Sequence, residues 1–392
     1  MKWRVEGFAA AGVHCGLKQD GALDLAVIVS DRPAAAAGVF TRNRFPGAPV
    51  IVSRSHLRGG VARGAVVNSR ISNVAMGAQG LADAREMALL TAREIGARPR
   101  EIQVASTGVI GWPLPMDKLR RGIPRAVAQL SPAGWRRAAR AIMTTDTVSK
   151  LAGRELSGGR LLGIAKGAAM CMPDMATMLA FLVTDLAVEP AFLRASLREA
   201  VGPTFNALTI DGETSTSDSV VLFANGAAGN RPIGARSRRA GEFRRGLQEL
   251  CAELADMLAL DGEGVTKLAE IRVSGARGAA QAGRIARRIA TSVLVKTALT
   301  GADPNWGRVI QALGTAGVPF RRDQVGVTFG GVEMLRGGEP VDDPGALRRA
   351  ERAMRRKRVS IEVRVGRGPG SARVLTTDLS SEYVRLNSEY TT

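Results

Sequence analysis

The chain has 392 residues, of which 45% are hydrophobic and 23% are charged, an ordinary composition for a globular protein. This length predicts either two lobes or one large α/β domain. The sequence contains no window of about 18 uncharged apolar residues and no continuous apolar stretch near its start, which argues against a transmembrane helix and a signal peptide. Three cysteines without metal-ligand spacing predict reduced thiols and a cytoplasmic location.

The formal net charge of +19 raises the question of a nucleic-acid partner. The basic residues are scattered, with dense runs only at 234–246 and 346–358, and the second run has the spacing of one solvated helix face. Aromatic residues make up only 4%, so platforms for stacking bases are scarce. We therefore expect an arginine-rich surface with no nucleic-acid and no membrane partner. A non-enzymatic basic binding protein stays open as an alternative.

Hydrophobic periodicity predicts helices and strands that interleave along the whole chain. In chain order, the pattern predicts strands at 22–30, 48–54 and 64–69, a helix at 80–96, a strand at 101–111 that runs into a glycine turn, a helix at 132–146, a strand at 161–170, a strand or buried helix at 175–185, helices at 190–208 and 241–260, a partly helical stretch at 288–301 and a strand at 360–368. This order predicts an α/β or α+β fold.

Several common kinds of catalytic site are difficult to build from this sequence. The chain has two histidines, His14 and His56, and neither lies near a serine motif, which weighs against a Ser-His-Asp or Cys-His arrangement. Zinc sites lack ligands for the same reason. The glycine-rich stretch "GRGPGS" (366–371) lacks the Lys-Ser/Thr end of a phosphate-binding loop, which weighs against a kinase or ATPase.

A nucleophile that supplies its own base remains, and the stretch "CMPDMATMLAFLVTD" (171–185) contains a candidate. An N-terminal threonine can act in this way, because its α-amine, with a pKa of roughly 7.7–8, takes the hydroxyl proton. An internal threonine reaches that state only if the chain is cut before it by an N-to-O acyl shift. A small preceding residue helps this shift, and Ala176–Thr177 fits. Local composition alone favours a structural strand threonine at this position.

The stretch "GIAKGAAMCMPDMATMLAFLVTD", which contains Lys166 and Thr177, resembles the self-cleavage motif of the ornithine acetyltransferase family, also called bifunctional glutamate N-acetyltransferase. The variants "PDMAT" and "YVRLNSEYTT" resemble most the paralogue found with clavulanic acid biosynthesis. Further blocks resemble the family in the same order and cover nearly the whole chain: "GVFTRNRFPGAPV" (38–50), "ASTGVIG" (105–111), "AIMTTDT" (141–147), "FNALTIDGETSTSDS" (205–219), "DGEGVTKL" (261–268), "LVKTALTGADPNWGR" (294–308) and "YVRLNSEYTT" (383–392).

The resemblance implies an α/β (mixed α+β) sheet-and-helix sandwich of the ornithine-acetyltransferase/DmpA-like kind. It implies self-cleavage into an alpha chain, 1–176, and a beta chain, 177–392, which interdigitate and assemble as an α2β2 heterotetramer. The implied activity is ping-pong transfer of acetyl from N2-acetylornithine to glutamate, with no metal and no other cofactor. Two related activities stay open: an acetyltransferase of specialised, clavulanate-like metabolism, and an N-terminal-nucleophile amidase or peptidase.

The resemblance also implies roles for individual residues. Thr177 is the expected nucleophile, both for cleavage at Ala176–Thr177 and for acetyl transfer, while Thr107 and Gly108 are the expected oxyanion hole. The residues expected to bind substrate are Thr144, Lys166, Thr177, Glu263, Asn387 and Thr392. The chain departs from the family pattern at Arg70, Ile71, Ala168, Ala169 and Asp174.

Overall fold

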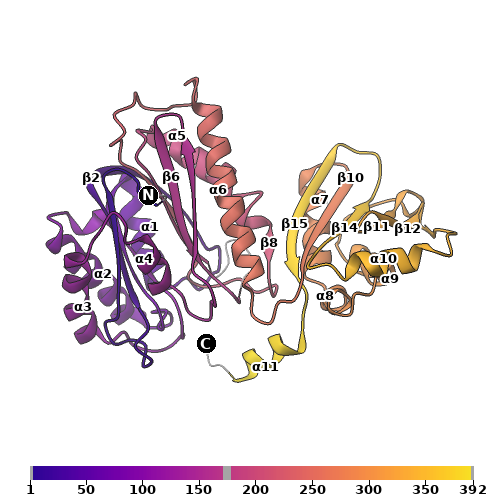
Figure 1. Cartoon of the computed structure of the whole chain (residues 1–392), viewed down its shortest axis with the longest axis horizontal. Helices are drawn as coiled ribbons and strands as arrows, with labels where there is room; N and C mark the ends of the chain where they lie inside the picture. The colour runs from indigo at the N-terminus through magenta and orange to yellow at the C-terminus, as the bar shows by residue number, and fades with distance from the viewer. Residues whose placement is uncertain (1–2, 171–177, 390–392) are drawn as a thin grey trace. The chain divides into compact units, whose positions relative to one another are not determined.

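The structure is a computed structural model that describes residues 3–170 and 178–389 (Figure 1). Its internal contacts divide the chain into two compact units. Unit 1 comprises residues 1–206 and 214–258, and unit 2 comprises residues 207–213 and 259–390.

Unit 1 is built around one mixed sheet with helices packed against it. Its strands are β1 (Phe8–Val13), β2 (Leu25–Phe40), β3 (Val61–Asn68), β4 (Ile102–Ser106), β5 (Lys150–Leu156), β6 (Gly159–Lys166), β7 (Leu179–Thr184) and β9 (Ser219–Ala224). Its helices are α1 (Ala48–His56), α2 (Gly77–Glu94), α3 (Met116–Ala128), α4 (Trp135–Ala141), α5 (Pro190–Val201) and α6 (Ala240–Leu260), with short 3₁₀ turns at Leu57–Gly59, Pro99–Glu101 and Phe205–Ala207.

The strand order of this sheet is β4-β3-β2-β9-β7-β6-β5, and β1 pairs with the first part of β2. The long strand β2 changes partner along its length: Leu25–Val29 pair with β3, whereas Ala35–Phe40 pair with β9, and the register shifts between Val29 and Ala34. Strand β7 lies between β6, to which it is antiparallel, and β9, to which it is parallel. The two strands of this sheet that follow the Ala176–Thr177 bond, β7 and β9, therefore lie in its middle, between strands that precede the bond.

Two apolar clusters show how the helices cover this sheet. The first joins Ile28 and Val67, from one half of the sheet, to Ile164 and Phe181, from the other half, and includes Trp135 of α4. The second lies on the opposite face of β2 and β3, where α1, α2 and α3 pack. Helices α3 and α5 pack against β2, and α2 packs against β3 and β4. The expected α/β sandwich class is therefore confirmed.

Unit 2 has a second mixed sheet, with strand order β13-β12-β11-β14-β10-β15-β8. Its strands are β8 (Leu208–Thr209), β10 (Leu268–Ala276), β11 (Gly326–Phe329), β12 (Val332–Arg336), β13 (Glu339–Pro340), β14 (Arg358–Arg364) and β15 (Gly370–Thr377). Its helices are α7 (Ala279–Ala290), α8 (Val293–Thr300), α9 (Trp306–Gly314), α10 (Ala346–Met354) and α11 (Ser381–Glu389), with a 3₁₀ turn at Arg322–Gln324.

The two faces of this second sheet differ in polarity. Alternate residues of β10 and β14, such as Ile271 and Ile361, are buried in one core with residues of α7, α8, α9 and α10. The residues between them face the other way, where Arg272 lies within ion-pair distance of Glu270 and Glu362. This alternation is typical of a sheet covered by helices on one face only.

Most predicted elements are confirmed, and one is wrong. Residues 48–54 form helix α1 instead of a strand. Pro49 occupies the first turn, where its fixed φ angle favours a helix start, and Val50 and Val52 are buried. That burial outweighs the few tenths of a kcal/mol, roughly, that a β-branched residue costs in a helix. The predicted helix at 132–146 is shorter, since α4 ends at Ala141.

Candidate functional site

A buried lysine lies at the centre of the predicted site in unit 1. Lys166 is the last residue of β6 and is only 2% exposed. Its Nζ atom donates hydrogen bonds to Oγ1 of Thr107, at 3.1 Å, and to Oγ1 of Thr144, at 2.8 Å. Because Lys166 donates to both oxygens, each threonine can direct its own hydroxyl hydrogen elsewhere. The structure thus brings three of the sequence-predicted residues together.

Thr107 and Gly108 follow strand β4 in a turn. At position 108 only glycine fits this turn. Gly108 has a φ of +127°, and a Cβ atom there would lie 2.2 Å from the Arg70 carbonyl group. The flanking N–H groups of Thr107 and Val109 donate to the carbonyls of Asn68 and Arg70. The N–H of Gly108 donates to no acceptor among the residues that the structure describes. A hydroxyl and an N–H side by side are the donors that an oxyanion hole needs.

Asp146 orders the loop around Thr144, a role that the sequence did not reveal. Its carboxylate accepts hydrogen bonds from the backbone N–H groups of Thr144 and Gly167 and from Nζ of Lys150, at 3.0, 2.7 and 2.5 Å. Burial raises the pKa of this carboxyl, but the nearby Lys166 and Lys150 lower it more, to about 2. A fixed negative charge therefore lies beside Lys166 and offsets its burial.

Asp218 is a second buried carboxyl that sequence reasoning did not assign. It precedes β9, is 0% exposed, and accepts a hydrogen bond from the backbone N–H of Met178 at 3.0 Å. Burial raises its pKa well above the ordinary value, although the Met178 N–H, the Thr41 hydroxyl and Lys166 act in the opposite direction. The available signal was an aspartate within the block "TSTSDS", directly before an apolar strand.

Two further predicted residues lie together in unit 2. Asn387, on α11, donates from Nδ2 to Oε2 of Glu263 at 2.8 Å and to the Tyr383 carbonyl at 3.0 Å. Tyr383 also directs its hydroxyl toward Asp211 at 3.4 Å. Burial, followed by the charges of Asp211 and Glu263, raises the pKa of the Tyr383 hydroxyl. This corner of unit 2 is acidic and suits a cationic group.

Three predicted residues, Ala176, Thr177 and Thr392, lie outside the described residues. Their expected roles as cleavage site, nucleophile and substrate contact stay predictions. The first described residue after Thr177 is Met178, which is buried and leads into β7.

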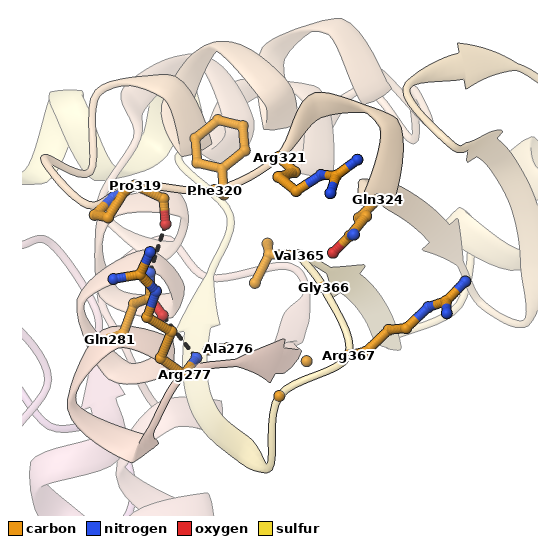
Figure 2. A pocket seen from close by; sticks show the side chains of 12 residues that line it. Ala276, Arg277, Gln281, Pro319, Phe320, Arg321, Gln324, Val365, Gly366 and Arg367 are labelled. Atoms are coloured by element: carbon orange, nitrogen blue, oxygen red, sulfur yellow. Dashed lines mark hydrogen bonds between the residues drawn. The ribbon is translucent and has the colours of Figure 1, made fainter.

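The residues of the predicted site do not line the hollow of about 260 Å³ drawn in Figure 2. That hollow lies in unit 2, at the ends of β10 and β14. Gln281 closes one side of it, since its side chain accepts from the Arg277 N–H and donates to the Pro319 carbonyl.

The described part of the chain contains no cluster of three or more His, Cys, Asp or Glu side chains placed to hold a metal ion. None of the helices in that part combines the length and the apolar character that crossing a bilayer requires. Cys15 and Cys251 are free thiols.

Fold and site together define a mixed α/β protein in which a buried lysine orients two threonine hydroxyls beside a strand-end glycine. Comparison with known proteins identifies the family. The model of the ArgJ family matches residues 9–392, so the chain belongs to the ArgJ family. The family expected from the sequence motifs is confirmed.

Individual relatives agree with this assignment. The arginine biosynthesis bifunctional protein ArgJ of Geobacter sulfurreducens is 45% identical over 392 residues, which cover 99% of this chain and 100% of the relative. The protein of the same name from Symbiobacterium thermophilum is 45% identical, over 98% of this chain and 97% of the relative. The crystal structure of argJ from Bacillus halodurans aligns with a TM-score of 0.51 and 36% identity, over 53% of this chain and 96% of that chain.

Proposed function

We propose that this protein is a glutamate N-acetyltransferase of arginine biosynthesis, which moves acetyl from N2-acetylornithine to glutamate. Membership of the ArgJ family along almost the whole chain supports this proposal. The observation that carries it is the buried Lys166, which donates to the hydroxyls of Thr107 and Thr144 beside the N–H of Gly108. The relatives compared carry the arginine-biosynthesis name, which does not favour a specialised-metabolism enzyme or an amidase.

The proposed reaction begins with self-cleavage. The Thr177 hydroxyl attacks the Ala176 carbonyl carbon, the Ala176–Thr177 C–N bond breaks, and the amine of Thr177 takes a proton. Water then hydrolyses the ester, which leaves a carboxylate on Ala176 and a free α-amine on Thr177. The amine is the base that the later steps require.

Acetyl transfer then uses the same hydroxyl. Thr177 Oγ attacks the acetyl carbonyl of N2-acetylornithine, and its proton passes to the Thr177 amine. The Thr107 hydroxyl and the Gly108 N–H hold the oxyanion. The amide C–N bond breaks, the proton passes to the departing amine of ornithine, and an acetyl-threonine ester remains. The amine of glutamate attacks this ester by the reverse sequence and leaves as N-acetylglutamate.

The charged residues suit an amino-acid substrate. A lysine ammonium such as that of Lys166 binds an α-carboxylate, and a carboxylate such as that of Glu263 binds an amino group. We also assign substrate binding to Thr144, to Asn387 and to Thr392. We further propose that the fragments 1–176 and 177–392 assemble as an α2β2 heterotetramer in the cytoplasm, with these small amino acids as substrates.

The test is the loss of N2-acetylornithine with and without glutamate. Loss that depends on glutamate and matches the N-acetylglutamate formed supports the transferase. Equal loss in water alone would contradict it and would indicate an amidase.

A further inference from the structure

Arg70 has a backbone conformation that favours glycine. Its φ angle is +86°, in the left-handed region that residues with a side chain rarely adopt. Glycine adopts this conformation without steric cost, whereas any other residue there destabilises the fold. Arg70 is also one of the positions where the sequence departs from the family pattern. A strained residue of this kind, next to the proposed active site, is expected to contribute through its side chain.

The backbone of Arg70 lies against the turn that carries Thr107 and Gly108. The Arg70 carbonyl group accepts a hydrogen bond from the Val109 N–H at 2.9 Å. A Cβ atom on Gly108 would lie 2.7 Å from the Arg70 Cα atom. The next residue, Ile71, pairs with Val109 as a parallel β-bridge. Main-chain contacts therefore fix Arg70 beside the proposed oxyanion hole.

The Arg70 side chain begins beside Gly108 and ends at Trp112. Its guanidinium carbon lies 5.4 Å from the centre of the Trp112 ring, in a cation–π contact. Trp112 is 45% exposed, and Gly108 and Arg70 are half-buried, so a ligand can reach this contact from solvent. A guanidinium group next to an aromatic ring keeps its N–H groups in its own plane, where they can bind a carboxylate at two points.

We propose that Arg70 is a specificity-determining residue that binds the side-chain carboxylate of the acetyl acceptor. This inference rests on the proposed function, in which the acceptor is glutamate. Two cations contact consecutive residues of one turn, since Lys166 donates to Thr107 and Arg70 lies against Gly108. Glutamate has two carboxylates, one for each cation, whereas ornithine has a side-chain ammonium group that a second cation repels. Arg70 therefore favours glutamate over ornithine as the acceptor.

The test measures kcat/KM separately for the acceptor, glutamate, and for the donor, N2-acetylornithine. In Arg70→Ala and Arg70→Gly we expect kcat/KM for glutamate to fall by about 10–100-fold, the usual effect of losing hydrogen bonds to a charged group, whereas kcat/KM for the donor does not fall. Glutamine has nearly the same shape as glutamate without the charge, so the variants and the wild-type protein should use it equally. Arg70→Lys keeps the charge and should keep most of the activity with glutamate.

The alanine and glycine variants separate charge from strain. Alanine retains the strained φ angle and glycine relieves it, so Tm should be higher for Arg70→Gly than for Arg70→Ala, although both lose activity with glutamate. The matched control is Arg244→Ala on α6. This variant removes a guanidinium group that lies 5.0 Å from the centre of the Phe192 ring, and it should leave all of these constants unchanged.

Two outcomes would overturn the role of Arg70 alone. The first is an unchanged kcat/KM for glutamate in Arg70→Ala and Arg70→Gly. The second is an equal loss for glutamate and for N2-acetylornithine, which a general disturbance of the turn would cause. If Arg70→Ala does not fold, Arg70→Gly decides, because glycine fits this φ angle. A wild-type protein that transfers no acetyl to glutamate would instead overturn the proposed function, and this inference with it.

Discussion

Lys166 is a buried cation whose side chain points at hydroxyl groups. Its hydrogen bonds to Thr107 and Thr144 fix the oxygens of both threonines as acceptors, which turns their hydrogens toward other groups. An oxyanion gains most from such donors when they are already oriented before the reaction. The arrangement suits Thr107 to a role as a pre-oriented oxyanion donor.

The variant Thr107→Ala tests this role. Loss of the hydroxyl should lower kcat for acetyl transfer by about 10²–10³-fold, the usual effect of removing one oxyanion donor. Steady-state kinetics measures it. Thr107→Ser keeps a hydroxyl at the same place and should retain most of the activity. Similar kcat values for the alanine, serine and wild-type proteins would contradict the assignment.

Asp146 should stabilise the fold in a pH-dependent way. Its pKa is lowered from the ordinary 3.8 to about 2, so its contribution is complete above about pH 4 and is lost as the pH falls toward 2. At pH 7, Asp146→Asn leaves Lys150 buried without its carboxylate, and we expect a loss of about 3–5 kcal/mol in the free energy of unfolding. Urea unfolding at pH 7 and pH 3 measures this free energy for both proteins. The difference between Asp146→Asn and wild type should be smaller at pH 3. A constant difference would argue against the ion pair.

Sequence motifs predicted Thr107, Thr144 and Lys166 as site residues. They did not single out Asp146 or Asp218. The three predicted residues belong to motifs that resemble a family with known roles. The two aspartates act through burial and through backbone N–H groups of segments distant in sequence, such as Gly167 and Met178. The sequence does not reveal such partners, because the residue type alone does not distinguish a buried aspartate from one at the surface.

At the scale of elements, secondary structure could be predicted where buried and exposed residues recur with the period of a helix or a strand. The helix at 241–260 was predicted almost to the residue, because its apolar positions recur at helical spacing. The segment 175–185 stayed ambiguous, since every residue of β7 is buried and no alternation is left to read. Helix α1 was predicted as a strand because its valines favour one locally, whereas tertiary packing decides.

Helix α11 should affect activity more than stability. Its residues are exposed or half-buried, and Asn387 contacts Glu263 from this helix. We expect Asn387→Ala to raise KM for the amino-acid substrates by about tenfold, which corresponds to about 1.4 kcal/mol, and to change Tm little. Ser388→Ala, which removes only a bond to the Arg385 carbonyl, is the control. An equal effect of both variants, or a large fall in Tm for Asn387→Ala, would count against a substrate role.

At the scale of the whole molecule, the interleaving of strands has a consequence for the cut protein. Strand β7 pairs with β6, and β9 pairs with β2, so each pairing joins residues from opposite sides of the Ala176–Thr177 bond. Separating the fragments would break ladders in the middle of a sheet and expose its core. The fragments should therefore behave as one folded body.

Native and denaturing mass measurements can test this consequence. We expect both fragments to co-elute under native conditions with a mass of twice the 41.3 kDa chain, the value for α2β2. Denaturant should release them together in one transition. A fragment that elutes alone under native conditions would contradict the interleaved sheet, and a native mass of one chain would contradict the heterotetramer.

The most direct measurement is the intact mass of the purified wild-type protein and of Thr177→Ala under denaturing conditions. The proposed mechanism predicts two wild-type fragments, one ending at Ala176 and one beginning at Thr177. It predicts a single, inactive 41.3 kDa species for Thr177→Ala, because the attacking hydroxyl is gone. A wild-type protein that transfers acetyl as one uncut chain, or a Thr177→Ala chain that is still cut, would contradict Thr177 as the nucleophile.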